Sequence, residues 1–140
     1  MYALIIDIIV SLLLGSMVFF AVVVTPTVFQ SLTPDQASNF LRTIFPRVHL
    51  WGIVFSIAAL GVCLFHSPKG SVLVTLILIG FVYARQILTP KINESRDAYL
   101  SSESAEDKAR FDALHRRSVI IYVAQMLMLV TIIIAMNDVS

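Results

Sequence analysis

Charge is scarce in this sequence, and its scarcity excludes most soluble folds. Lys, Arg, Asp and Glu make up 14% of the 140 residues, whereas about a quarter is usual in soluble domains. Hydrophobic residues account for 58% of the chain, and the mean hydropathy is +0.87. We therefore expect an integral membrane protein whose single domain spans residues 1–140.

Cysteine is nearly absent too. Cys63 is the only one, so the chain can form no intrachain disulfide and carries no cysteine-based metal motif. The N-terminus lacks the basic stretch and the small-residue cleavage site of a signal peptide, and its first charged side chain is Asp7. The first apolar segment is therefore expected to remain in the mature protein.

Catalytic signatures are missing as well. Nothing in the sequence resembles a nucleophile elbow, a phosphate-binding loop, a zinc-protease helix or a pair of catalytic carboxylates. Acidic and basic residues alternate between positions 103 and 112, which is typical of a solvated helix face and not of a nucleic-acid-binding surface. We predict no catalytic residue and no nucleic-acid partner, and we favour a protein that is not an enzyme.

Long apolar segments are what the sequence has in abundance. Four of them are long enough to cross a hydrocarbon core of about 30 Å, at residues 4–24, 48–65, 72–88 and 118–136. Pairs of small residues four apart occur on every span, which favours close helix packing and leaves a homo-oligomer open. The pattern predicts an all-α integral membrane fold, a bundle of four transmembrane helices.

Two polar excursions separate these spans, and they resemble each other. Each begins at a Thr-Pro pair, with Pro26 in the first and Pro90 in the second, and each ends with a Phe four residues before a His, at His49 and His115. We interpret the chain as two helical-hairpin repeats, a known membrane architecture.

The two excursions are expected to be oriented differently. A capping box from Thr33 and apolar residues at helical spacing predict an amphipathic helix over residues 34–45, which lies flat at the interface and ends at Pro46. Pro90 is expected to kink the third helix, and residues 89–117 then form a helical hairpin that projects into the cytoplasm.

The basic residues predict the orientation. Nine of the ten Lys and Arg residues lie on the side of the Thr-Pro pairs, counting Arg85, which is expected to snorkel to the headgroups, and only Lys69 lies on the other side. Because cytoplasmic loops are enriched in Lys and Arg, we predict a multi-pass protein of the inner membrane, with both termini outside the cytoplasm. The lipid bilayer is its first partner.

His49 and His115 are the first candidate site residues. They open the second and fourth spans at the same predicted depth, so together they could ligate a metal ion or haem iron. Arg47 and Arg116 lie next to them and suit carboxylates or phosphates. The alternative is that these histidines bond to backbone carbonyls or headgroups and the arginines only set the topology, which is the more frequent role at a membrane rim.

The Thr-Pro pairs form a second candidate site. A proline inside a helix leaves a carbonyl without its donor, and such breaks often border binding sites in transporters. Pro26, Pro90, Thr89 and Asn93 belong to this set. The simpler interpretation is that proline punctuates the ends of the spans.

Several short motifs resemble one known family. They are Gly15-Ser-Met-Val-Phe-Phe, Pro26-Thr-Val-Phe29, Phe45-Pro46-Arg47, Thr89-Pro90-Lys-Ile-Asn93, and Phe111 with Leu114-His115-Arg116-Arg117-Ser118. Their combination is similar to that of the transmembrane protein 205-like family, also described as domain of unknown function 4149. The resemblance implies a four-helix integral membrane protein and brings no established activity. Many relatives have Tyr after Phe-Pro-Arg, where this chain has Val48, so the resemblance supports His115 better than His49.

These observations predict a protein that binds, or transports, a small solute or a metal complex at a cytoplasm-facing site near His115, Pro26 and Pro90. One rival is a haem-binding or quinone-reactive membrane oxidoreductase that uses His49 and His115 as ligands. Another is a non-catalytic assembly factor whose hairpin docks a partner. The first interpretation needs no cofactor, whereas the oxidoreductase would need haem or a metal ion.

Overall fold

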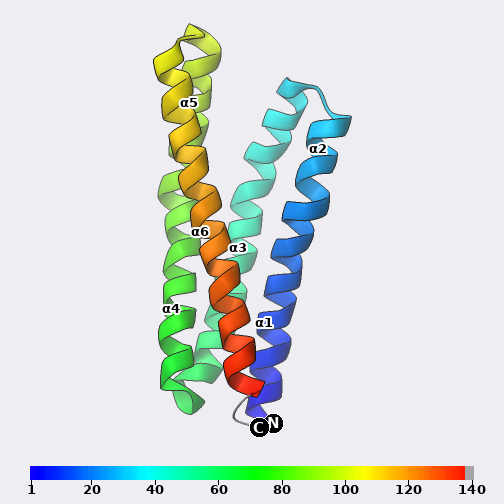
Figure 1. The fold of residues 1–140 in the computed structure, drawn as a ribbon, viewed down its shortest axis with the longest axis vertical. Coiled ribbons are helices and arrows are strands. Elements are labelled where there is room, and N and C mark those ends of the chain that lie inside the picture. The colour runs from blue at the N-terminus through cyan, green and yellow to red at the C-terminus, as the bar shows by residue number, and fades with distance from the viewer. Residues whose placement is uncertain (138–140) are drawn as a thin grey trace.

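The computed structural model describes residues 1–137, and these fold into helices joined by short turns (Figure 1). In chain order the elements are α1 (Tyr2–Phe19), the π-helical turn η1 (Phe20–Val24), α2 (Thr25–Ser31), α3 (Pro34–His66), α4 (Pro68–Tyr83), the π-helical turn η2 (Ala84–Leu88), α5 (Thr89–Ser102) and α6 (Ala105–Asn137).

These elements form four long rods. α1, η1 and α2 make one continuous rod and α4, η2 and α5 make another, while α3 and α6 are single helices. The rods contain 30 to 35 residues and are long and apolar enough to cross a membrane. At 1.5 Å per residue they measure about 45–52 Å, more than the roughly 30 Å of a hydrocarbon core. The fold is the predicted all-α bundle of four membrane-spanning helices.

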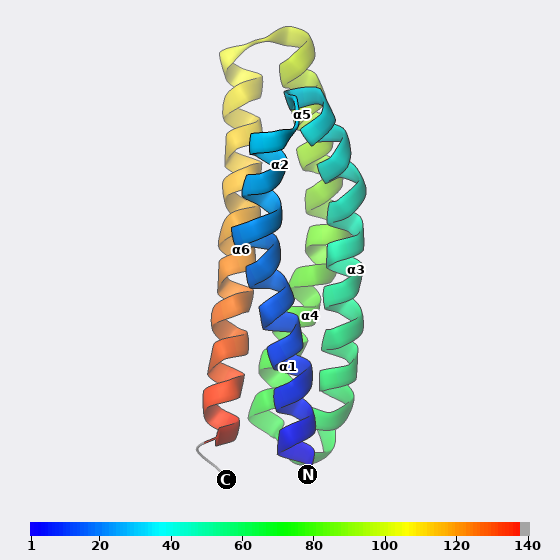
Figure 2. The same ribbon diagram turned by 90° about the vertical axis from the view of Figure 1, so that its right-hand side faces the viewer.

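The rods pack in a square. α1 contacts α3 and α6, and α4 also contacts α3 and α6, so α1 is diagonal to α4 and α3 is diagonal to α6 (Figure 2). Both termini and the α3–α4 turn lie at one end, which we call the terminal end (Figure 1). The α2–α3 and α5–α6 turns lie at the opposite end, which carries most of the charged side chains and which we call the charged end.

The hydrophobic core occupies the terminal half of the bundle. All four rods contribute to it. Its fully buried side chains are Ile6, Val10, Leu13 and Met17 of α1, Ala59 and Cys63 of α3, Val74, Ile77 and Phe81 of α4, and Leu129 and Ile132 of α6. Most other apolar side chains on the rods are exposed, and no more than a third of each spanning segment is buried within the protein. A surface this apolar belongs in lipid.

Both Thr-Pro pairs lie within continuous helices. A proline removes one amide donor, and here a π-helical turn precedes each pair, η1 before Thr25-Pro26 and η2 before Thr89-Pro90. The Thr25 hydroxyl donates to the Phe20 carbonyl at 3.0 Å and so supplies a donor where the backbone ladder is altered. The same local structure occurs at equivalent positions in both halves of the chain, consistent with a repeat.

The expectation of a separate interfacial helix that ends at Pro46 is wrong. The helix begins as predicted, with a capping box between Thr33 and Gln36, but α3 passes through Pro46 and continues to His66. A mid-helix proline costs about 3 kcal/mol. The apolar face of residues 34–45 offsets that cost because it does not face lipid: Ala37 and Leu41 are buried in a small cluster with Val28 of α2.

The second excursion is a standing hairpin. α5 ends at Ser102, Glu103 takes a left-handed conformation with φ of 50°, and α6 then runs without interruption from Ala105 into the fourth span. The hydroxyls of Ser102 and Ser104 donate to the Asp107 carboxylate at the start of α6. These hydrogen bonds lower the pKa of Asp107 below its usual range and hold the turn.

Candidate functional site

His49 lies inside the bundle on the face of α3 that packs against α4. It is 5% exposed, and its ring lies between those of Phe45 and Phe81, with centroid separations of 6.0 and 6.3 Å. Its Nδ1 atom is buried and has no hydrogen-bond partner among the described residues. Leaving such an atom unpaired costs about 1–3 kcal/mol, so packing alone does not account for a histidine here.

Arg85 approaches the same face of α3 from η2. Its Nε donates to the Pro46 carbonyl at 3.3 Å, one helical turn from His49 toward the charged end. Arg85, which the sequence predicts to snorkel to the headgroups, thus contacts the neighbouring helix as well. Gly52 allows this, because its lack of a side chain lets the Phe81 ring pack directly on α3 and brings the two helices close together.

Five of the described polar side chains are buried within the bundle, and we call them the polar track. They are Ser95, Thr89, His49, Ser56 and Gln125, in order from the charged end toward the middle of the bundle. Gln125 Nε2 donates to the Ile77 carbonyl at 3.0 Å. The hydroxyls of Ser56 and Ser95, like the His49 Nδ1, lack a partner within residues 1–137. Unsatisfied buried groups of this kind are rare in native proteins and mark positions where water or a ligand binds.

The other predicted site residues are dispersed. His115 and Arg116 are exposed on α6, Arg47 is exposed on α3, and both Pro26 and Pro90 are exposed at their helix surfaces. From the Thr-Pro set, Thr89 is buried and Asn93 is half-buried. The predicted residues therefore divide into an interior group around His49 and an exterior group on the surface of the charged end.

The two histidines share a local geometry but not a site. Phe111 stacks on His115 with a centroid separation of 6.0 Å, the same value as for Phe45 and His49. However, α3 and α6 are diagonal and make no contact within the described part of the chain. Residues 1–137 also contain no group of three or more His, Cys, Asp and Glu side chains placed to hold a metal ion. Within one protomer, this geometry does not fit a metal or haem iron shared by both histidines.

A set of contacts that the sequence did not reveal joins the two excursions. Arg42 of α3 forms an ion pair with Asp97 of α5, and Arg96 donates to the Ser38 hydroxyl at 3.0 Å. The Arg96 guanidinium also lies 5.3 Å from the centre of the Phe111 ring on α6. The hydrogen bond from Arg42 lowers the pKa of Asp97, and burial lowers that of Arg96. We call these contacts the clasp. It joins α3 to the α5–α6 hairpin.

Fold and site together define a four-helix integral membrane protein with a buried histidine in its charged half. Residues 8–99 match the model of the family described as domain of unknown function (DUF4149), so the chain belongs to that family. Neither a search of curated proteins nor a search of solved structures found a match. The matched segment includes His49, Arg85 and both Thr-Pro pairs, whereas His115 lies beyond it.

Proposed function

We propose that this protein is a multi-pass protein of the inner membrane that binds a small polar solute inside the charged half of its bundle. The observation that carries the proposal is the buried Nδ1 of His49, which has no partner among residues 1–137, together with Arg85 of η2 on the Pro46 carbonyl, one helical turn away. Ionisable side chains within membrane helices are rare and costly, and they commonly mark solute or ion sites.

The chemistry of these two side chains indicates the kind of solute. A guanidinium has five donors and favours carboxylates and other oxyanions, and Arg85 uses only its Nε in the contact with Pro46. The His49 Nδ1 can accept or donate a hydrogen bond, or it can offer its lone pair to a metal complex that brings its other ligands. Small oxyanions, carboxylates and such complexes are the solutes that we propose.

The position of the hydrophobic core supports access of a solute to the polar track from the charged end only. The buried polar track lies between the charged end and the middle of the bundle, and the terminal half is closed by apolar side chains from all four rods. A solute would therefore enter from the charged end. Transport across the membrane would need a rearrangement of the core, or a path between protomers of a homo-oligomer.

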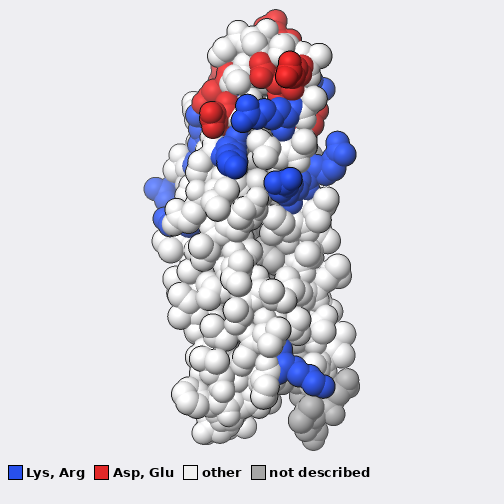
Figure 3. Space-filling model, turned by 90° about the vertical axis from the view of Figure 1, so that its left-hand side faces the viewer, with Lys and Arg blue, Asp and Glu red and all other residues white. Residues whose placement is uncertain are grey.

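The charge distribution supports a cytoplasmic position for the charged end. Figure 3 shows a belt of Lys and Arg below an acidic tip, and an almost uncharged surface along the rest of that face. Lys69, in the first turn of α4, is the basic residue at the terminal end. The positive-inside rule then places both termini outside the cytoplasm. The motifs at Pro26, Phe45 and Pro90 further support affiliation with the transmembrane protein 205-like family.

Thermal unfolding of the purified protein in detergent tests the solute site. The probes are acetate, citrate, phosphate and sulfate, together with zinc and copper salts. We expect at least one probe to raise the melting temperature of the wild type and of the control His115→Leu, but not that of His49→Leu. Equal shifts in all three proteins, or no shift with any probe, would count against an interior site.

An absorption spectrum tests the haem-binding rival independently. Protein purified from haem-replete cells should show no Soret band if the solute proposal is correct. A Soret band that disappears in both His49→Ala and His115→Ala would favour the oxidoreductase and would require the two histidines to come from different protomers, since they lie on diagonal helices.

The acidic tip of the α5–α6 hairpin favours a second candidate, the assembly factor. Glu103 and Glu106 are exposed at the α5–α6 turn, and Figure 3 shows acidic side chains beyond the basic belt. If a basic partner docks on this tip, then the double substitution Glu103→Lys, Glu106→Lys should abolish its co-purification while His49→Leu leaves co-purification intact. Co-purification that survives the double substitution would count against a docking tip.

A further inference from the structure

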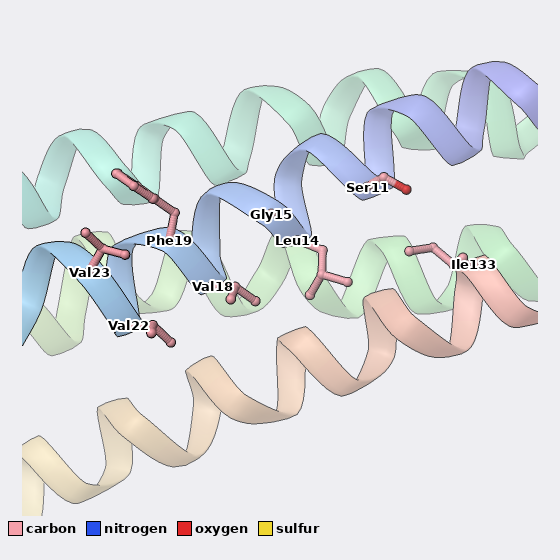
Figure 4. Close-up of a pocket in the computed structure, with 8 residues that line it drawn as sticks. All are labelled: Ser11, Leu14, Gly15, Val18, Phe19, Val22, Val23 and Ile133. Atoms are coloured by element: carbon pink, nitrogen blue, oxygen red, sulfur yellow. The ribbon is translucent and has the colours of Figure 1, made fainter.

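An apolar groove of about 530 Å³ follows the surface of the first rod beside α6, which contributes Ile133 to its lining. Figure 4 shows Leu14, Val18 and Val22 pointing from the first rod toward α6. Ile133 of α6 lies beside Leu14 and Ser11, at the end of the groove that is nearer the terminal end of the bundle. The groove lies outside the interior track that contains His49, and it opens toward lipid.

The groove exists because the two rods diverge. In the terminal half α6 packs against α1, and the Tyr122 hydroxyl donates to the Met17 carbonyl at 2.9 Å. Farther toward the charged end, α6 contacts neither η1 nor α2 in the part of the chain that the structure describes. Gly15 keeps the wall shallow, since a Cβ built there would meet none of the described atoms within 4 Å.

The length of the groove matches one leaflet. From Ser11 to Val23 it follows the first rod for about 18 Å at 1.5 Å per residue, and half of a hydrocarbon core is about 15 Å. Its upper end at Val23 lies next to Thr25-Pro26, where the first apolar segment ends. The groove therefore faces the acyl chains of the leaflet at the charged end.

Two polar side chains of α6 lie above the mouth of this groove. His115 precedes Ile133 by five turns of 3.6 residues and is therefore on the same face of α6. By its helical rise it lies about 9 Å beyond the upper end of the groove, and Arg116, the next residue, lies slightly nearer. A headgroup layer is roughly 5–8 Å thick. His115 and Arg116 are both exposed and lie within reach of the phosphate layer. Arg117 is two residues beyond His115, about 200° further round the helix, and therefore faces away from the groove.

We propose that the groove and a polar rim, formed by His115 and Arg116, together bind one anionic phospholipid from the leaflet at the charged end. One acyl chain lies along Gly15, Val18 and Val22, and the phosphate contacts the rim. The complementarity of charge selects an anionic headgroup, while the length of the groove selects a single leaflet. This lipid site is separate from the proposed solute site at His49 and does not depend on it.

Native mass spectrometry of the detergent-solubilised protein tests this site, with phosphatidylglycerol as the probe and phosphatidylcholine as the neutral comparison. Gly15→Leu should fill the groove. Gly61→Leu is its matched control, because Gly61 is also a helix glycine around which a Cβ would meet nothing within 4 Å among the described atoms. We expect one bound phosphatidylglycerol in the wild type and in Gly61→Leu, and loss of that lipid in Gly15→Leu.

The substitution Arg116→Gln tests the rim. One basic residue near an anionic surface contributes about 1 kcal/mol, so binding should weaken roughly fivefold, whereas Arg117→Gln, on the opposite face of α6, should change it little. Three results would overturn the proposal: equal retention by Gly15→Leu and Gly61→Leu, equal binding of phosphatidylcholine, or a wild-type dimer that Gly15→Leu dissociates. The last would mean that a second copy of the chain covers the groove.

Discussion

Gly52 is the position at which the structure makes its sharpest prediction about stability. A Cβ built on Gly52 would lie 2.5 Å from ring carbons of Phe81, closer than any real contact, and both residues are buried between α3 and α4. Gly52→Ala should therefore force the two helices apart or push the ring out of its position. Overpacking of this kind costs about 1–3 kcal/mol.

The matched control is Gly61→Ala, one glycine farther along α3. Here a Cβ would meet none of the described atoms within 4 Å, so the substitution should only gain helix propensity, about 0.5–1 kcal/mol. The two alanine variants have the same composition, and the propensity gain applies to both. Their difference in unfolding free energy should therefore be about 1–3 kcal/mol, with Gly52→Ala the less stable.

Reversible unfolding in mixed micelles, followed by the loss of helical circular dichroism, measures this difference. A double-mutant cycle with Phe81→Leu sharpens it, since the smaller side chain should relieve much of the clash with Ala at position 52 and give a favourable coupling. If Gly52→Ala and Gly61→Ala are equally stable, then α3 and α4 do not approach as closely as the structure shows. The contact of Arg85 with Pro46 would then lose its basis.

Three further predictions concern two hydrogen-bonded contacts and the orientation of the protein in the membrane. Gln125→Leu removes the hydrogen bond to the Ile77 carbonyl and should destabilise the bundle by about 0.6 kcal/mol, the average for such bonds within membranes, which the same unfolding assay can measure. The hydrogen bond from Arg42 lowers the pKa of Asp97 in the folded protein. The stabilisation from this pair should therefore be complete above the unfolded carboxylate's pKa of about 3.9 and should be lost as the pH falls through the lower folded pKa. Melting curves of wild type and Asp97→Asn should differ at pH 7 and converge at acidic pH. Ser104→Cys should react with a membrane-impermeant thiol reagent in inside-out vesicles but not in intact cells, with wild-type Cys63 as a silent background because it is buried; the opposite pattern would refute a cytoplasmic charged end.

Most of the fold could be predicted from the sequence because lipid imposes a simple rule. A span must be apolar over about 20 residues, and the four segments that satisfy this rule lie within the four rods. The failure at Pro46 has a physical reason. The free-energy cost of a proline inside a helix is local and can be estimated from the sequence. The burial of Ala37 and Leu41 against Val28 depends on where α2 ends and how it packs against α3.

The candidate site was only partly predictable for the same reason. The repeat in the sequence identified His49 as a candidate site residue. The burial of its side chain depends on Gly52 of α3 and Phe81 of α4, which lie on different rods. The contact of Arg85 with Pro46 also joins two rods. The sequence contained one usable signal, a lone arginine in the last turn of an apolar span. An arginine that snorkels to the headgroups and an arginine that bonds to a neighbouring helix would both occupy this position, so the sequence does not distinguish them.

His49 is buried and His115 is exposed because the two halves of the chain pack differently. Each stacks on a Phe four residues earlier, as a duplicated motif would. The part of α3 that carries His49 packs on α4, so this ring is enclosed, whereas the part of α6 that carries His115 diverges from α2 and leaves its ring exposed. The corresponding position of the predicted repeat is thus an interior side chain in one half and a surface side chain in the other. If the two proposals are correct, His49→Leu should abolish the solute-induced stabilisation and retain the bound lipid, and substitution of the rim should do the reverse.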